Sequence, residues 1–336
     1  MKPSVAILEP VATVDTSRLD AEYRALTEGC GLLDRSERGK LALTGPGAKE
    51  FLAGQVTNDT EALVPGEGCY DAFLTPKGKM LGDLRILDRG EELLIDTERV
   101  ALQALFDMIR RFKIGYEVEL HKRTVERGLL SLLGPDAPRV ASAEGLPAVE
   151  HANSAVEIEG VAAVVARTDV GVDLICDAAD TEQLAKALHE RGAVPVSEEA
   201  AEIVRVEHGR PRYGIDLDET VIPQEAGLNE RAVSFTKGCY VGQETVARLF
   251  YKGKPNRHLR GLRLSAPVEP GAELGLGERS VGRLTSSVLS PAHGPIGLAL
   301  VRREAEPGAS VSVGEQEHGA SAEVVELPFA ARRDGR

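Results

Sequence analysis

Several patterns that mark particular classes of protein are scarce or missing in this sequence of 336 residues. Tryptophan is absent, and aromatic residues make up 4% of the chain. No uncharged apolar run approaches the ~20 residues that a membrane-spanning helix needs. The opening MKPSVAILEP lacks the apolar stretch and small-residue cleavage site of a secretory signal. We therefore expect a soluble cytoplasmic protein with no membrane partner.

Cysteine is also scarce, with only Cys30, Cys69, Cys176 and Cys239 in the chain. None of them forms a CxxC pair, so the spacings typical of zinc sites and disulfide frameworks are missing. A few scattered thiols suit a reducing compartment, and we expect most of them to be core residues. The seven histidines show no spacing typical of metal ligands, and we predict no metal site.

Positive charge is in deficit, since 40 Lys and Arg face 53 Asp and Glu and leave a net charge of −13. Phosphate binding draws on an excess of Lys and Arg, so we expect no direct nucleic-acid partner. The chain does have 42% hydrophobic residues, which excludes a disordered protein. Its length is enough for two or three domains with well-sized cores.

The order of the expected elements predicts an α+β fold. Strand pairs and helices are mixed, without regular βαβ alternation, over residues 1–254, which we expect to form two interleaved subdomains. From residue 255 to 336, short extended runs alternate with Gly and Pro, a spacing typical of a small β-barrel. The segment 134–153, rich in Pro, Ala and Ser, predicts a surface loop.

Helices and turns can be placed more closely. We predict strands over 68–75 and 80–88, joined by Pro76-Lys77-Gly78-Lys79, which has the chemistry of a type II turn. An apolar stripe predicts a helix from Thr97 to about Lys113. Further helices are expected over 180–191 and 198–207, and Ser197 caps the second of them.

The octapeptide KGCYVGQE, residues 237–244, is the segment most informative about function. Two glycines bracket Cys239, so the backbone can turn tightly and approach a ligand closely. The following TVARLF could begin a helix, whose positive end would favour the thiolate together with Lys237. The alternative is a buried cysteine in a glycine-rich loop, because cysteine often acts only as a small hydrophobe.

KGCYVGQE closely resembles the signature of the YgfZ family, folate-binding relatives of the glycine-cleavage T-protein. Other blocks resemble the T-protein superfamily more generally, and together they span nearly the whole chain. They are LLDRSERGKLALTGPGAKEFLAGQVTNDT (32–60), GEGCYDAFLTPKGKMLGDLRIL (66–87), RVEHGRPRYGIDLDE (205–219) and VGRLTSSVLSPAHGPIGLALV in the last domain. The resemblance implies a T-protein-like folate-binding region followed by a C-terminal barrel.

The resemblance also implies a tetrahydrofolate site in the region before the barrel. Glu207 matches the family's pterin-contacting carboxylate, although a solvated glutamate at a helix end is the simpler alternative. Asn58 could face the ligand, but an Asn in Thr-Asn-Asp is often a cap or turn residue. Gln243, within the octapeptide, is a further candidate contact.

Asp83 decides the catalytic interpretation. T-proteins usually carry paired aspartates just after a Gly-Gly turn, and one of these carboxylates lies near the folate nitrogen that receives the one-carbon unit. Here the pair reads Gly82-Asp83 and the turn reads Gly78-Lys79, so one carboxylate is lost and a cation is gained. Two carboxylates can tune one another, whereas one alone leaves that arrangement in doubt. A surface residue at a strand end is the alternative for Asp83.

Residues 246–263 reverse the overall charge, with six basic side chains and no acidic one. They are Arg248, Lys252, Lys254, Arg257, Arg260 and Arg263. Such a rim, Arg248 included, would attract the glutamate tail of a folate. It would equally attract RNA phosphates, and a solvated linker between domains is the common meaning of such a run.

We therefore expect a tetrahydrofolate-binding accessory protein for the assembly or repair of [4Fe–4S] enzymes, which would support tRNA modification indirectly. Its partners would be folate and iron–sulfur client or assembly proteins. Cys239 would supply the thiol, with Lys237 beside it and Asp83 at the pterin. A folate-dependent aminomethyltransferase or demethylase is the alternative, and it would need Asp83 alone to suffice. An RNA-binding factor is a third hypothesis.

Overall fold

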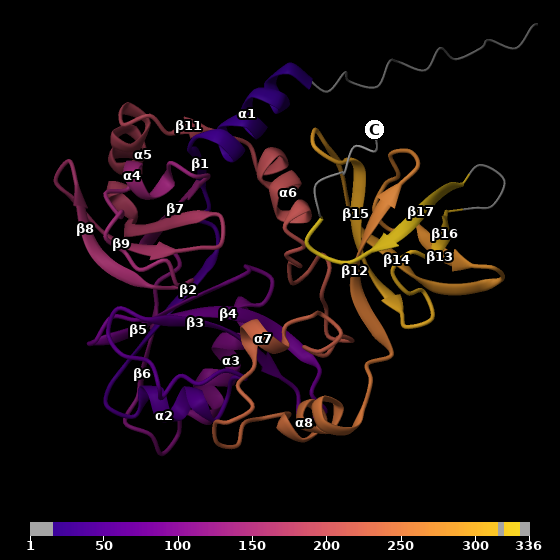
Figure 1. Ribbon diagram of the computed structural model, residues 1–336. Helices are drawn as coiled ribbons and strands as arrows, with labels where there is room; N and C mark the ends of the chain where they lie inside the picture. Colours follow the sequence, from indigo (N-terminus) through magenta and orange to yellow (C-terminus); the bar gives the residue numbers. More distant parts are fainter. Residues whose placement is uncertain (1–15, 315–318, 330–336) are drawn as a thin grey trace, which may run out of the picture.

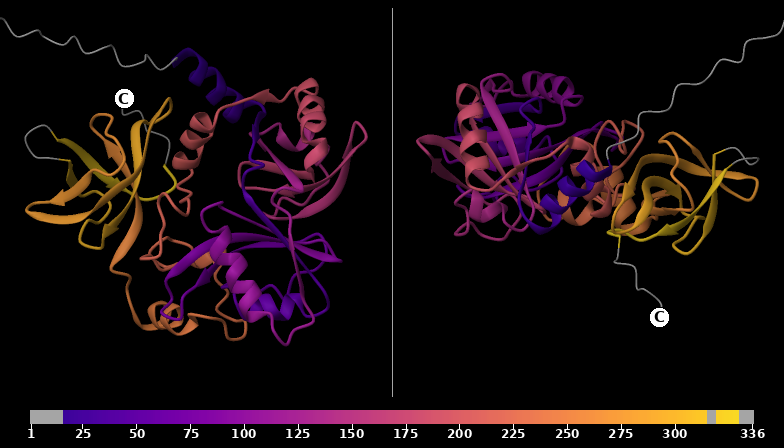
Figure 2. Two further views of the ribbon diagram at one scale, coloured as in Figure 1. Left: turned by 180° about the vertical axis from the view of Figure 1, so that it is seen from behind. Right: turned by 90° about the horizontal axis from the view of Figure 1, so that it is seen from above.

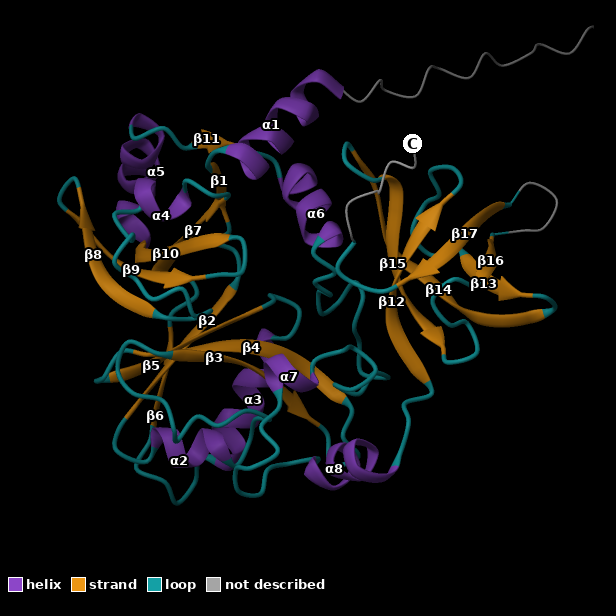
Figure 3. Ribbon diagram, viewed as in Figure 1, coloured by secondary structure: helices purple, strands orange, loops and turns teal. Residues whose placement is uncertain are grey.

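The computed structural model describes residues 16–314 and 319–329, so the opening MKPSVAILEP lies outside the described residues. Two β-sheets lie one above the other, and a β-barrel lies beside them (Figure 1). The view from above keeps the barrel apart from the paired sheets (Figure 2), and the strands dominate all three units (Figure 3). The fold is mixed α+β, as the sequence predicts.

The first sheet is antiparallel, with the strand order β3-β4-β5-β2-β6. Its strands are β2 (Gly39–Thr44), β3 (Gly68–Leu74), β4 (Met80–Asp88), β5 (Glu92–Thr97) and β6 (Glu119–Lys122). Helices α2 (Ala48–Ala53) and α3 (Leu102–Phe112) share a core with Leu84 and Ile86 of β4. Because side chains alternate along a strand, Asp83 and Arg85 point away from that core. This second face carries the candidate site.

The second sheet has the order β11-β1-β7-β10-β9-β8, with one parallel pair between β1 and β11. Its strands are β1 (Gly31–Asp34), β7 (Arg127–Leu133), β8 (Asn153–Ile158), β9 (Val161–Arg167), β10 (Gly171–Asp177) and β11 (Val194–Pro195). The short helices α4 (Ala137–Val140) and η1 (Ala178–Asp180) and the longer α5 (Thr181–Glu190) pack against it. Apolar side chains of α4 and α5 close the core of this unit.

Two helices connect the sheets to the barrel. Helix α1 (Thr16–Glu28) packs on α6 (Glu198–Glu207), and α6 also contacts barrel strands β14 and β15. The Ser197 hydroxyl accepts a hydrogen bond from Ala200 N at 3.3 Å, which confirms the predicted cap of α6. Helix α6 therefore packs against α1 on one side and against the barrel on another.

The C-terminal unit is a closed barrel with the order β12-β15-β14-β13-β16-β17. Its strands are β12 (Arg257–Leu264), β13 (Glu273–Leu276), β14 (Arg279–Ser290), β15 (Gly294–Arg302), β16 (Ser310–Val313) and β17 (Ala320–Val325). Leu259, Ile296 and Leu298 of the barrel share one buried cluster with Leu74 and Met80 of the first sheet. The barrel and the first sheet are thus joined by an apolar interface.

Two expectations need correction. The helix predicted from Thr97 begins at Leu102, because Thr97 ends β5 and its hydroxyl donates to Asp83 O. The segment 134–153, predicted to be a surface loop, contains α4 and buries many of its residues. Its small alanines, such as Ala137 and Ala141, pack closely against the second sheet, which composition alone does not show.

Among residues 16–314 and 319–329, no helix combines the length and the apolar character that crossing a membrane requires.

Candidate functional site

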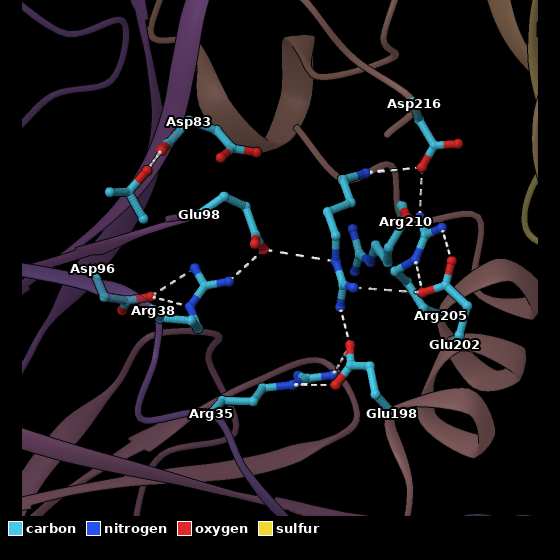
Figure 4. Close-up of polar contacts among 12 residues, drawn as sticks. Arg35, Arg38, Asp83, Asp96, Glu98, Glu198, Glu202, Arg205, Arg210 and Asp216 are labelled. Carbon is cyan, nitrogen blue, oxygen red and sulfur yellow. Dashed lines mark hydrogen bonds and ion pairs between the residues drawn. The ribbon is translucent and has the colours of Figure 1, made fainter. Parts of the chain in front are cut away.

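A cavity of about 190 Å³ lies between the first sheet, the second sheet and the end of α6. We call it the central cavity. Its wall is strongly charged, with seven arginines and six carboxylates. They are Arg35, Arg38, Arg85, Arg205, Arg210, Arg212 and Arg231, and Asp83, Asp96, Glu98, Glu150, Asp169 and Asp173. Figure 4 shows much of this network.

The arginines of the wall are held by carboxylates. Arg85 donates to Asp96 at 2.6 Å and lies 2.7 Å from Asp173, so it ties the first sheet to the second. Arg38 contacts Asp96 at 2.8 Å. Burial alone would raise the pKa of Asp96, but Arg85 and Arg38 outweigh it and lower this pKa to about 2. Asp96 therefore stays ionised and is a structural anion.

Asp83 differs from the other carboxylates of the wall because it forms no ion pair among the described residues. The Tyr70 hydroxyl donates to Asp83 Oδ2 at 2.5 Å, and Thr97 fixes the Asp83 carbonyl. Burial raises the pKa of Asp83 to about 6, although the Tyr70 hydrogen bond lowers it. In Figure 4 its carboxylate points away from its own strand, with no dashed contact to an arginine. This carboxylate can gain or lose a proton near neutral pH.

His151 also lies in the wall, and the sequence pattern does not single it out. The residue is 7% exposed, and neither ring nitrogen has a hydrogen-bond partner in the part of the chain that the structure describes. Burial, aided by the positive charge of Arg85, lowers the pKa of His151 to about 4. The imidazole is therefore neutral at pH 7.

A second, more open cavity of about 400 Å³ adjoins the central one, and we call it the outer cavity. Asn58 lines it, which places this predicted residue next to the central cavity but not in its wall. The Asn58 side chain donates to Tyr70 O at 3.1 Å and to Arg231 O at 3.3 Å. Asn58 thus fixes the backbone of two residues that line both cavities.

A buried thiol, that of Cys69, also lines the outer cavity. The Cys69 thiol donates to Asp71 Oδ2 at 3.0 Å, and burial raises the pKa of this thiol well above its usual value. Burial likewise raises the pKa of Asp71 to about 6. Cys30, Cys69 and Cys176 are all buried, whereas Cys239 is exposed. This distribution agrees with the expectation that most of the four cysteines belong to the core.

Glu207 does not share the cavity that Asp83 lines. Its carboxylate accepts hydrogen bonds from the Tyr23 hydroxyl, at 3.0 and 3.2 Å, and from the Ser290 hydroxyl. The side chain is buried, so it is not the solvated helix-end residue of the simpler alternative. It joins α1 and the barrel at the end of α6.

The octapeptide surrounds the start of α8 (Gln243–Lys252), the helix expected after it. Cys239 is exposed, four residues before the helix begins. The Lys237 ammonium donates to three backbone carbonyls, those of Ala53, Val56 and Asn58. Lys237 therefore holds the end of α2 and the following loop. The side-chain amide of Gln243 donates to the Gly238 carbonyl at 3.4 Å.

The basic residues of 246–263 do not form one rim. Arg248 is exposed on α8, and it lines neither cavity. Arg257 pairs with Glu225 at 2.8 Å and Arg260 with Glu326 at 3.0 Å. The helix and β12 thus carry these cations to different surfaces.

Three residues that build the site, namely Tyr70, His151 and Arg231, are missing from the sequence prediction. Arg231 pairs with Glu150, and its guanidinium lies 4.3 Å from the centre of the Tyr70 ring. Tyr70 lies in the segment 66–87 that resembles the T-protein superfamily, on the strand that pairs with the strand of Asp83, so the alternation of the two strands is a signal that could have found it. His151 and Arg231 come from irregular segments far apart in the chain, and no local pattern brings them together.

Two family models match the chain. The GCVT N-terminal domain matches residues 12–237, and the glycine cleavage T-protein C-terminal barrel domain matches residues 257–330. An aminomethyltransferase of Rubrobacter xylanophilus is 30% identical over 331 residues, which cover 95% of this chain and 88% of the relative. A chloroplastic protein of Arabidopsis thaliana that carries the name transferase is 29% identical over 327 residues, covering 94% and 74%.

A solved structure agrees with these matches. The glycine cleavage system aminomethyltransferase T of Bartonella henselae superposes with a TM-score of 0.83 at 25% sequence identity. The superposition covers 93% of this chain and 89% of that one. The likeness therefore extends over the sheets and the barrel together.

Proposed function

The chain belongs to the glycine-cleavage T-protein family, and from this membership we propose that it is a tetrahydrofolate-dependent enzyme that transfers a one-carbon unit in its central cavity. The observation that carries the proposal is Asp83, a buried carboxylate without an ion pair among the described residues, in an otherwise neutralised wall. The names of the aminomethyltransferase relatives support the same reaction class.

The residues of the central cavity fit a pterin. Asp83 and His151 are buried polar groups that lack a full set of partners within the described chain, and a pterin edge carries both donors and acceptors for them. Tyr70 and His151 also line the outer cavity, through which the rest of a folate would extend. When bound, tetrahydrofolate supplies the nitrogen that accepts the one-carbon unit.

Asp83 would handle the proton of this transfer. With tetrahydrofolate bound, the ionised carboxylate would accept the proton that a folate nitrogen gives up for each C–N bond that forms. It would return that proton to the donor atom whose bond to the same carbon breaks, and a methylene product needs two such exchanges. Tyr70 keeps Oδ2 of Asp83 in place, so Oδ1 is the oxygen that reaches the ligand.

Turnover of a one-carbon donor tests the proposal. We expect the wild-type chain to form methylenetetrahydrofolate from an aminomethyl donor, whose carbon is already at the oxidation level of the product, and Asp83→Asn to lose at least 100-fold in rate. Glu98→Gln, a change in the same wall at a paired carboxylate, is the matched control and should lose much less. Tetrahydrofolate binding without turnover of any such donor would contradict the proposed transfer.

Cys239 favours a second candidate function, that of a YgfZ-type accessory protein for [4Fe–4S] enzymes. Its thiol is exposed next to α8, within the octapeptide that resembles the YgfZ signature. In this function the folate is bound in the same cavity, while the thiol acts on a client protein in the cytoplasm. Support of tRNA modification would follow through that client.

Complementation separates the two candidates. In a strain that lacks this protein, Cys239→Ser should fail to restore iron–sulfur enzyme activity if the accessory function holds, whereas Cys30→Ser, a buried thiol, should restore it when the chain folds. Lys237→Ala does not test the thiol function, because this change removes three hydrogen bonds that stabilise the fold. Full activity of the Cys239→Ser strain would rule out the thiol function.

A further inference from the structure

The central and outer cavities share a wall. Tyr70, Glu150, His151, Arg210 and Arg231 line both of them. A ligand that fills the central cavity and extends into the outer one must therefore pass these side chains. Among these five residues, His151 is the one whose polar side-chain atoms, Nδ1 and Nε2, make no hydrogen bond within residues 16–314 and 319–329.

The charged members of this wall are already engaged with one another. Arg231 pairs with Glu150 and covers the Tyr70 ring, and Arg210 donates to Asp169 at 2.6 Å. Nε2 of His151 lies 3.6 Å from Glu150 Oε1, which is too long for a hydrogen bond. Within the described part of the chain, the imidazole thus keeps both its donor and its acceptor unused.

The backbone holds His151 in this position at an energetic cost. Its φ is 70°, in the left-handed region that side chains rarely adopt, while its amide donates to Arg167 O and its carbonyl accepts from Asn153. Gly68 lies directly against it, since a Cβ on Gly68 would come within 2.9 Å of His151 Cβ and 2.5 Å of Ile86 O. Strained backbone and unpartnered buried polar groups are both unfavourable, and together they indicate a ligand-binding function.

We propose that His151 is a positioning residue that hydrogen-bonds the polar edge of the pterin ring through its neutral imidazole. A neutral imidazole offers one N–H donor and one nitrogen acceptor, and a reduced pterin edge offers N–H donors and a carbonyl acceptor to match them. The inference rests on the proposed binding of tetrahydrofolate. It adds that recognition of the ring depends on an uncharged contact in an otherwise ionic wall.

Two variants separate a hydrogen bond from packing. His151→Phe keeps a flat ring but removes both nitrogens, and His151→Asn keeps polar atoms in a residue type that tolerates a left-handed backbone. His121→Phe, on β6 and outside both cavities, is the matched control. Binding of tetrahydrofolate and of 6-methyltetrahydropterin, which lacks the tail, is measured by isothermal titration, and thermal unfolding of each free protein is measured in parallel.

We expect His151→Phe to weaken the binding of both probes at least tenfold, without lowering the melting temperature of the free protein. His151→Asn should recover a large part of that loss, and His121→Phe should bind like the wild type. Equal affinity of His151→Phe and wild type would overturn the inference while leaving folate binding intact. So would an equal loss in both His151 variants, because packing alone would explain it. Failure of the wild type to bind either probe would overturn the proposed function and this inference together.

Discussion

Asp83 is buried and has no cationic partner in the described chain, and this environment affects its chemistry and the stability of the fold together. Its neighbour in the wall, Asp96, is also buried but is neutralised by Arg38 and Arg85. Asp96 therefore has a structural role, whereas Asp83 is free to exchange a proton. Two predictions follow from the Asp83 side chain alone.

The first concerns the pH dependence of turnover. The pKa of Asp83 is about 6 because of burial, and the ionised form accepts the proton. We therefore expect kcat/KM for a one-carbon donor to fall tenfold per pH unit below about pH 6 and to level off above it. A pH profile that is flat between pH 5 and 8 would remove Asp83 from the reaction.

The second concerns stability. A carboxyl whose pKa is higher in the folded chain than in the unfolded chain destabilises the fold once it ionises. The destabilisation grows as pH rises from about 4 to about 6 and is constant above that. Asp83→Asn should therefore unfold like the wild type near pH 4 and be more stable above pH 6, by roughly 3 kcal/mol. Urea unfolding at pH 4.5 and 7.5 measures the difference, and an Asn variant that is less stable at pH 7.5 would contradict it.

The two residues that we propose to face the ligand, Asp83 and His151, differ in how far the sequence could reveal them. Asp83 stands in a block that resembles the T-protein superfamily, so the motif points to it directly. His151 lies in a segment whose composition predicts a loop. What singles it out is that neither of its ring nitrogens has a hydrogen-bond partner among the described residues. Missing contacts depend on the whole fold, and no local spacing encodes them. The same limit applies to Glu207, whose hydrogen bonds come from α1 and the barrel.

At the scale of elements, the β3–β4 turn packs on the start of α8. Gly242 caps α8 with a φ of 86°, and Gly78 in the turn has a φ of 76°. A Cβ at Gly242 would lie 2.7 Å from Thr75 O, and one at Gly78 would lie 2.8 Å from Thr245 Cβ. This close approach places the octapeptide at the end of the hairpin that carries Asp83.

Gly242→Ala should therefore destabilise the fold by about 1–3 kcal/mol, from the left-handed backbone and the close contact together. Gly238→Ala, in the same octapeptide, is the matched control, since a Cβ there meets nothing within 4 Å. Chemical denaturation of both variants tests the difference. Equal stabilities would show that the turn and the helix are not packed in this way.

Local chemistry explains which elements the sequence predicts well. The Pro-Lys-Gly-Lys turn and the alternation on either side define the β3–β4 hairpin, and Ser197 defines the start of α6. The segment 134–153 shows the opposite case, because its alanines pack through their small size rather than through a hydrophobic pattern. The spread of Arg248, Arg257 and Arg260 over separate surfaces is likewise a consequence of tertiary structure.

At the scale of the whole molecule, one buried polar cluster connects α6, the following loop and the barrel. Arg205 donates to Asp216 at 2.7 Å and to Ser286 at 2.6 Å, and Asp216 also accepts from Thr285 at 2.6 Å. The Asp216 side chain is fully buried. Loss of the Asp216 charge would leave the largely buried Arg205 with Glu202 as its remaining carboxylate partner among the described residues.

Asp216→Asn should therefore destabilise the molecule by about 3 kcal/mol, with the barrel and the sheets still unfolding together. We propose residues 1–254 and 255–336 as the two parts of the chain, but their shared core of Leu259, Met80 and neighbours predicts a single transition. Differential scanning calorimetry measures this directly, through the ratio of the calorimetric and van't Hoff enthalpies. Two separate transitions in the wild type would contradict the shared core.

The central claim is that tetrahydrofolate binds in the cavity that Asp83 lines. Isothermal titration of tetrahydrofolate into the wild-type chain and into Asp83→Asn at pH 7.5 tests it most directly, since Asp83 is ionised there and its Asn variant keeps the same size. We predict one binding site per wild-type chain and an affinity at least tenfold lower for Asp83→Asn. Absence of binding to the wild type, or equal affinity of the two chains, would contradict it.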